Sequence, residues 1–166
     1  MDKEILLSEL DASTKNLFES LSGFNETTFN HHPSETEWSP AQIAEHLLLL
    51  EIVANKALTG ETIPTNRPPD KKLSLIKWAM EDETKRVAPP IVIPSGNLKE
   101  ADELSQQLKK QREILRTAAA DADLTEACMS VKHPALGTLT KLEWVYFTIC
   151  HCNRHVRQME KLKASR

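Results

Sequence analysis

The chain has little of several features that define other classes of protein. It contains only four glycines, one tyrosine and three cysteines in 166 residues. It has no glycine-rich phosphate-binding loop, and neither a GxSxG nor an HExxH motif occurs. A small, odd number of cysteines argues against a disulfide framework. We therefore expect Cys128, Cys150 and Cys152 to be reduced thiols, some of them small core residues.

Long hydrophobic runs and an excess of basic charge are also absent. The longest dense apolar run, Leu47 to Leu50, is far below the roughly 18 residues of a membrane span. The formal net charge of -3 and the pI near 6.1 offer no basic face for nucleic acid. The first residues, Met1 to Glu4, lack the basic and then apolar layout of a secretion signal. We therefore expect a cytoplasmic protein that binds neither a membrane nor nucleic acid.

The chain does contain helical periodicity. It is 40% hydrophobic and 27% charged, as soluble globular proteins are, and its length fits one domain over residues 1–166. Apolar spacing predicts long helices over 3–21, 39–59 and 99–120, a shorter helix over 71–86, and a last long helix from about 140. Proline-containing stretches at 64–69 and 89–96 interrupt them. Four long helices and one short helix predict an all-α, four-helix-bundle fold.

Two helix starts are marked by capping boxes. Ser39 and Gln42 form one, with a proline at the first helical position between them. Thr140 and Glu143 form the other. At the end of the first helix, Gly23 is a candidate for a glycine stop.

Three histidines lie on apolar faces of these predicted helices. His46 shares a stripe with Ile43 and Leu50, whereas Glu51 and Asn55 fall off this stripe and are expected to be solvated. The other acidic residues are scattered along the helices, and we expect most of them to be solvated too. His151 and His155 are four residues apart, so they lie on the same face of the last helix.

Imidazoles in this pattern are typical ligands of a divalent metal ion. Two histidines at i and i+4, with a third from a facing helix, can hold an ion and leave a position for water or substrate. The other interpretation is that His46, His151 and His155 are ordinary core or partly exposed histidines bonded to the main chain. The HxxxH spacing is short and also arises by chance.

The remaining histidines give weaker indications. His31 and His32 precede a proline in a predicted loop and are expected at the surface. His133 also precedes a proline, just ahead of the last helix, and is a candidate for the edge of a pocket. Trp144 and Phe147 share the face of His151, where they either wall that pocket or pack in the core.

Two segments of the chain resemble a known family. Residues 38–47, from Trp38 to Leu47 and including Ser39 and His46, are similar to the second-helix signature of the DinB-like superfamily. Residues 133–158 are similar to its C-terminal signature, from His133-Pro134-Ala135-Leu136-Gly137 through Thr140, Glu143 and Trp144 to His151-Cys152-Asn153-Arg154-His155-Val156-Arg157-Gln158. The resemblance implies an up-down-down-up four-helix bundle with the short helix in its long crossover.

The same resemblance implies a divalent metal ion bound by His46, His151 and His155. Imidazole suits zinc, nickel and iron alike, so the metal cannot be identified from the sequence. Members of the superfamily include S-transferases that use bacillithiol or mycothiol, a thiol-dependent isomerase and proteins described as metal-dependent hydrolases. Many form homodimers. We therefore expect a homodimer, a small-molecule substrate and, for a transferase, a low-molecular-weight thiol as cosubstrate.

The sequence thus supports two hypotheses of different classes. The first is a metal-dependent thiol S-transferase or hydrolase, since three neutral imidazoles leave the ion's charge to attract a hydroxide or thiolate ligand. No carboxylate is spaced as a general base, which favours thiol transfer over protease-like hydrolysis. The alternative is a non-catalytic helical binding module whose histidine metal site is structural or vestigial.

Overall fold

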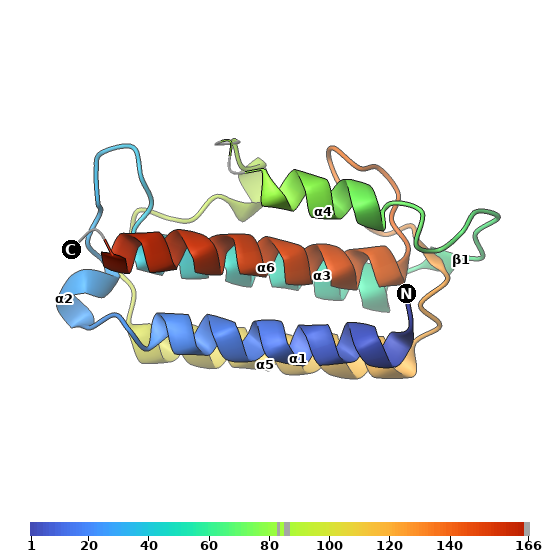
Figure 1. The fold of residues 1–166 in the computed structure, drawn as a ribbon, viewed down its shortest axis with the longest axis horizontal. Helices are drawn as coiled ribbons and strands as arrows, with labels where there is room; N and C mark the ends of the chain where they lie inside the picture. Colours follow the sequence, from blue (N-terminus) through green and yellow to red (C-terminus); the bar gives the residue numbers. More distant parts are fainter. Residues whose placement is uncertain (83, 85–86, 165–166) are drawn as a thin grey trace.

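Four long helices form the body of the computed structural model, which describes residues 1–82, 84 and 87–164 (Figure 1). They are α1 (Lys3–Leu21), α3 (Pro40–Thr59), α5 (Ala101–Asp121) and α6 (Lys141–Ala164). α1 and α6 run in one direction and α3 and α5 in the other, so the chain order is up, down, down, up (Figure 1). This confirms the predicted all-α four-helix bundle.

The packing of these helices explains the long crossover. α3 packs against α5 and α6, and α1 packs against α6 and α5. Because the neighbours α3 and α5 are parallel, the chain between them must return along the bundle. It does so through α4 (Leu73–Glu81), which covers α6, and the short 3₁₀ helix η1 (Pro90–Val92), which lies against α3.

Some small elements differ from the sequence prediction. α4 is shorter than the predicted span of 71–86: Asp82 is already extended, and the predicted end at Arg86 lies outside the described residues. The four-residue helix α2 (Glu26–Phe29) was not predicted, nor was the antiparallel pair β1 (Thr62–Ile63) and β2 (Ala127–Cys128). Elements this short carry too few residues for a periodicity to appear.

Both predicted capping boxes are formed. Ser39 Oγ accepts the backbone N–H of Gln42 at 3.2 Å, and Gln42 Oε1 accepts the N–H of Ser39 at 3.1 Å. Thr140 and Glu143 make the corresponding pair at 3.2 and 3.0 Å. The predicted glycine stop is wrong, because α1 ends at Leu21 with Ser22 as its cap and Gly23 has no positive φ.

A buried ion pair lies between α3 and α5. Arg112 Nε donates to Glu51 Oε1 at 2.6 Å, and their side chains are 2% and 0% exposed. Asn55 is buried one turn further along α3 and donates to Gln111. The expectation that Glu51 and Asn55 are solvated is therefore wrong. α3 packs against two long helices, so its buried arc is wider than one apolar stripe.

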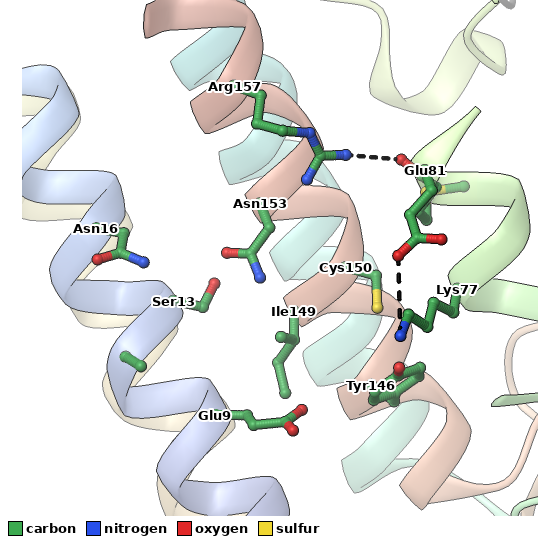
Figure 2. Close-up of a pocket in the computed structure, with 12 residues that line it drawn as sticks. Glu9, Ser13, Asn16, Lys77, Glu81, Tyr146, Ile149, Cys150, Asn153 and Arg157 are labelled. Atoms are coloured by element: carbon green, nitrogen blue, oxygen red, sulfur yellow. Dashed lines mark hydrogen bonds and ion pairs between the residues drawn. The ribbon is translucent and has the colours of Figure 1, made fainter. Parts of the chain in front are cut away.

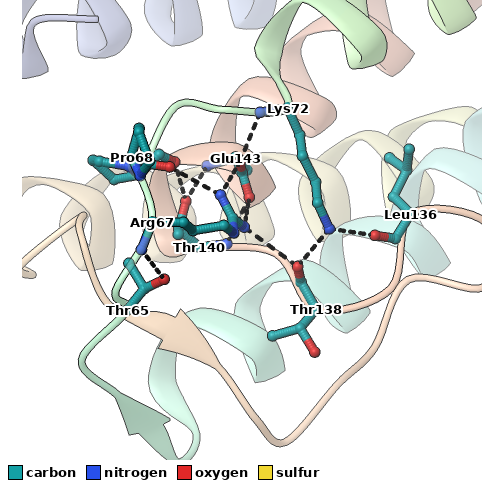
Figure 3. A network of polar contacts seen from close by, with 9 residues as sticks. Thr65, Arg67, Pro68, Lys72, Leu136, Thr138, Thr140 and Glu143 are labelled. Atoms are coloured by element: carbon teal, nitrogen blue, oxygen red, sulfur yellow. Dashed lines mark hydrogen bonds and ion pairs between the residues drawn. The ribbon is translucent and has the colours of Figure 1, made fainter.

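A second buried carboxylate fixes the start of α6 (Figure 3). Both oxygens of Glu143 accept from the guanidinium of Arg67, at 2.7 and 2.6 Å, and Oε1 also accepts the N–H of Lys72 at 2.9 Å. Glu143 is the capping residue that the sequence predicts, and its carboxylate is fully buried. Through this carboxylate the first part of the crossover is tied to α6.

In the part of the chain that the structure describes, no helix combines the length and apolar character needed to cross a membrane.

Candidate metal centre

Three imidazoles from two helices meet inside the bundle. His46 extends from α3, and His151 and His155 extend from α6. One nitrogen of each ring lies within 4.8 Å of the others, and the Nε2 atoms of His46 and His151 are 3.3 Å apart. Of the described residues, these three form a His, Cys, Asp or Glu group with the spacing to surround an ion.

The tautomer of His46 is set by the crossover. Its Nδ1 lies 2.6 Å from the carbonyl oxygen of Val92, which only accepts, so Nδ1 carries the proton and Nε2 keeps its lone pair. The ring also packs against Trp38, with 4.9 Å between centroids. The crossover is held there by Glu45, which accepts the N–H of Ser95 at 2.9 Å. The neighbour of His46 on α3 thus helps to place the carbonyl that orients its ring.

His155 is oriented in a similar way from within α6. Its Nδ1 donates to Oε1 of Gln158 at 2.9 Å, which leaves Nε2 as the atom available to an ion. His151 is 4.5 Å from His155 between ring centroids. The Nδ1 of His151 is buried and has no hydrogen-bond partner among the described residues. Two of the three rings therefore have the orienting partner that is usual for metal-binding histidines.

Burial keeps these imidazoles neutral. Desolvation lowers the pKa of His46 and lowers that of His155 to about 3. It lowers the pKa of His151 well below the usual value, and the neighbouring His155 and His46 lower it further. Neutral imidazoles are the form that binds metal, so at neutral pH no proton must leave first.

The residues present fit a divalent ion. Two nitrogens at a Zn–N distance of about 2.0–2.1 Å in a tetrahedral site are about 3.3–3.4 Å apart, close to the His46–His151 separation of 3.3 Å. The set is all nitrogen, as catalytic three-histidine sites are. Glu51 and Glu143 do not contribute, since Arg112 and Arg67 pair with them elsewhere. The three imidazoles would thus hold the ion alone.

The structure also places the other candidates. His31 and His32 are exposed, as expected. Trp144 and Phe147 are 1% and 3% exposed and belong to the core, which favours the packing interpretation over a pocket wall. His133 lies in the loop before α6, with its ring 4.6 Å from that of Phe147, which in turn is 5.4 Å from His151.

Val92 and Gln158 orient histidines, and sequence reasoning gave neither of them a role. Val92 acts through its backbone, so no residue type marks it. Gln158 carried a weak indication, because it follows His155 by three residues and therefore shares its helix face. An i,i+3 search around the HxxxH pair would have found it.

A separate groove lies on the opposite face of α6 (Figure 2). It encloses about 300 Å³ between α1, α4 and α6 and is lined by polar groups such as Glu9, Asn16, Tyr146 and Asn153. None of the three histidines lines it. The groove and the histidine cluster are therefore distinct sites on one helix.

Known proteins resemble the chain over most of its length. The model of the DinB superfamily matches residues 9–159. The Bacillus subtilis protein described as "Uncharacterized protein YuaE" is 28% identical over 145 residues, which cover 86% of this chain and 88% of that protein.

Two solved structures share the fold. TT2238, described as a four-helix bundle protein, has a TM-score of 0.62 at 19% identity and covers 96% of this chain and 99% of its own. YfiT from Bacillus subtilis has a TM-score of 0.63 at 16% identity and covers 98% of this chain and 86% of its own. YfiT is described as a probable metal-dependent hydrolase with an unusual four-helix bundle topology.

Proposed function

Since the chain belongs to the DinB superfamily, we propose that it is a divalent-metal-dependent enzyme that acts on a small molecule. The observation that carries the proposal is the convergence of His46, His151 and His155 within 4.8 Å. The description of YfiT as a probable metal-dependent hydrolase supports it. The lowered pKa values of the three rings support it too, because they leave the imidazoles ready for an ion.

The reaction would be the transfer of a thiol to the small molecule, or its hydrolysis. A divalent ion on three imidazoles supplies Lewis acidity, which lowers the pKa of a water or thiol toward neutrality. The chain's own part is to hold the imidazoles neutral and oriented, through Val92 and Gln158. The buried carboxylates of Glu51 and Glu143 are both paired with arginines, so neither is free as a general base. This favours thiol transfer.

Metal analysis tests the proposal directly. Protein purified without a nickel column, stripped with chelator and incubated with zinc, nickel or iron should retain one of these metals stoichiometrically. His151→Ala should lose most of the bound metal, whereas the exposed His32→Ala is the matched control and should load normally. A wild-type protein that stays empty with all three metals would contradict the proposal.

The reaction class needs a second measurement. The loaded protein is mixed with a chromogenic electrophile in the presence and absence of a low-molecular-weight thiol. Thiol transfer predicts turnover that requires the thiol and is lost in His151→Ala. Turnover that proceeds equally without thiol would identify the hydrolase instead.

A further inference from the structure

The imidazole of His133 is held in one tautomer by its own loop. Its Nδ1 accepts the backbone N–H groups of Ala135 and Leu136 at 3.2 and 3.1 Å. Backbone N–H groups only donate, so Nδ1 carries no proton and the neutral ring must carry it on Nε2. Burial lowers the pKa of His133 to about 4, so the ring is neutral at pH 7. Its Nε2–H donates to none of the described residues, and is thus a donor that the fold does not use.

The loop that fixes this ring is itself tightly held. His133 and Gly137 exchange backbone hydrogen bonds at 3.0 and 2.8 Å, and the φ of 68° at Gly137 closes the turn. Lys72 Nζ donates to the carbonyls of Leu136 and Thr138 at 2.5 and 2.9 Å (Figure 3). The backbone N–H of Lys72 is bound to Glu143, so the crossover, the loop and the start of α6 form one unit. The loop therefore holds the Nε2–H donor of His133 in one position before any ligand binds.

The ring of His133 is separated from the candidate metal centre by one aromatic ring. It packs edge-on against Phe147 at 4.6 Å, and Phe147 lies 5.4 Å from His151. Phe147 is thus the ring that separates His133 from His151. Trp144, 5.9 Å from His133, has a buried indole N–H without a partner among the described residues.

The surroundings of His133 favour an anion over a cation. The ammonium of Lys72, which is bound to the carbonyls of Leu136 and Thr138, is a positive charge at the same loop and lowers the pKa of the His133 ring. The group of this ring that the fold leaves unused, His133 Nε2–H, is also a donor. A carboxylate is the common small-molecule group that accepts such bonds and carries the complementary charge.

We propose that His133 is a substrate-positioning residue, whose Nε2–H donates to an oxygen of a carboxylate-bearing substrate next to His151. The inference rests on the proposed metal centre and names the substrate class of that same site. It also gives a role to a residue that the sequence marked only as the edge of a pocket.

Two substitutions distinguish the loss of the Nε2–H donor from damage to the loop. In His133→Asn, the side-chain oxygen can accept the same two backbone N–H groups, as in an Asx turn, but no group replaces Nε2–H. In His133→Gln, an amide N–H reaches about as far as Nε2. The melting temperature of His133→Asn should therefore stay within a few degrees of the wild-type value. The melting temperatures of both variants are measured before any ligand is added.

The test uses Co²⁺ as a spectroscopic probe in the full chain. Cobalt-loaded wild type is titrated with acetate and, separately, with ethanethiol, which has no oxygen acceptor, and the visible absorption of the metal reports both dissociation constants. In His133→Asn, acetate should bind about tenfold more weakly, the loss expected for one charge-assisted hydrogen bond. Ethanethiol should bind equally, and His133→Gln should recover part of the acetate affinity.

The outcomes distinguish this inference from the proposed function. Wild type and His133→Asn that load cobalt fully and bind acetate with the same affinity would overturn the role of His133 and leave the metal centre intact. A parallel loss of acetate and ethanethiol affinity would also overturn it, since that indicates a structural role. A wild type that takes up no cobalt would overturn both proposals.

Discussion

Each histidine of the cluster is neutral because burial removes its ring from water, and this has a consequence for stability. The pKa of His155 is about 3 in the folded chain, against the value of 6.5 for a histidine in water. Between these values the unfolded chain binds more protons, so the free energy of unfolding falls as the pH falls from 6.5 toward 3. The slope per group is at most about 1.4 kcal/mol per pH unit.

Urea unfolding of the chelated protein at pH 7, 6 and 5 measures this slope. His155→Gln removes one titrating group and should give a shallower dependence than wild type. Identical slopes for the two proteins would show that His155 is not held neutral by burial.

The ion pair of Glu51 and Arg112 makes a different prediction. Burial raises the pKa of Glu51 to about 7, even with Arg112 beside it. Arg112→Met leaves that carboxylate unpaired in the core and should lower the free energy of unfolding by about 3–5 kcal/mol. Combining it with Glu51→Leu should recover much of the loss, because both charges are then gone.

Arg116→Met is the matched control on the same helix. Arg116 pairs with Asp11 at 2.9 Å, and their side chains are 41% and 58% exposed, so its loss should change urea unfolding little. An Arg112→Met variant as stable as Arg116→Met would contradict the assignment of a buried charge pair.

At the residue level the sequence predicted the histidines better than their surroundings. Helical spacing and the family resemblance together placed His46, His151 and His155 on facing helices, and their nitrogens do meet within 4.8 Å. That they bind a metal stays a prediction. The carbonyl of Val92 could not be predicted, since it depends on the path of a crossover without periodicity. The burial of Glu51 was not predicted, because the apolar stripe that contains His46 is only part of the buried surface of α3.

The elements are joined by a few side chains, and the carboxylate of Glu143 is one of them. It caps α6 and binds Arg67 from the crossover, and it is 0% exposed. Glu143→Gln keeps the shape but removes the charge, so it should lower the free energy of unfolding by about 2 kcal/mol. Thermal or urea unfolding measures this.

The control is Glu81→Gln, whose ion pair with Lys77 is exposed and 3.9 Å long. It should leave stability nearly unchanged. Equal effects of Glu143→Gln and Glu81→Gln would mean that the buried network does not fasten the crossover to α6.

The starts of two long helices follow from local chemistry, and the end of α4 does not. Ser39 with Gln42 and Thr140 with Glu143 place the starts of α3 and α6 because a capping box satisfies backbone groups within four residues. α4 ends at Glu81, several residues before the predicted bound. Its extent depends on contact with α6, which local sequence does not report.

For the whole molecule, metal and folding should be linked. An ion that binds only the folded chain raises the free energy of unfolding by about 2.7 kcal/mol when its free concentration is about 100 times its dissociation constant. Chelator should therefore lower the melting temperature of wild type and leave that of His151→Ala unchanged. A wild type with the same melting temperature in chelator and in zinc would contradict a bound ion.

Thermal unfolding with and without chelator also tests the alternative of a non-catalytic module. A structural ion should stabilise the chain strongly and leave no coordination position for acetate or a thiol. A catalytic ion should bind acetate or a thiol, and the visible absorption of the cobalt-loaded protein should then change when either ligand is added.

Residues 141–149 at the start of α6 are all buried, because α1, α3, α4 and α5 contact this helix. Most helices of a small bundle keep a solvent face on which mutations accumulate without penalty. α6 has none along this stretch, and its next turns carry the histidines. In a saturation mutagenesis library, tolerance along α1 and α5 should rise and fall with the helical repeat, whereas along residues 141–149 of α6 it should stay uniformly low. We therefore expect substitutions in this protein to accumulate on the exposed faces of its other helices and in its loops, and not in residues 141–149.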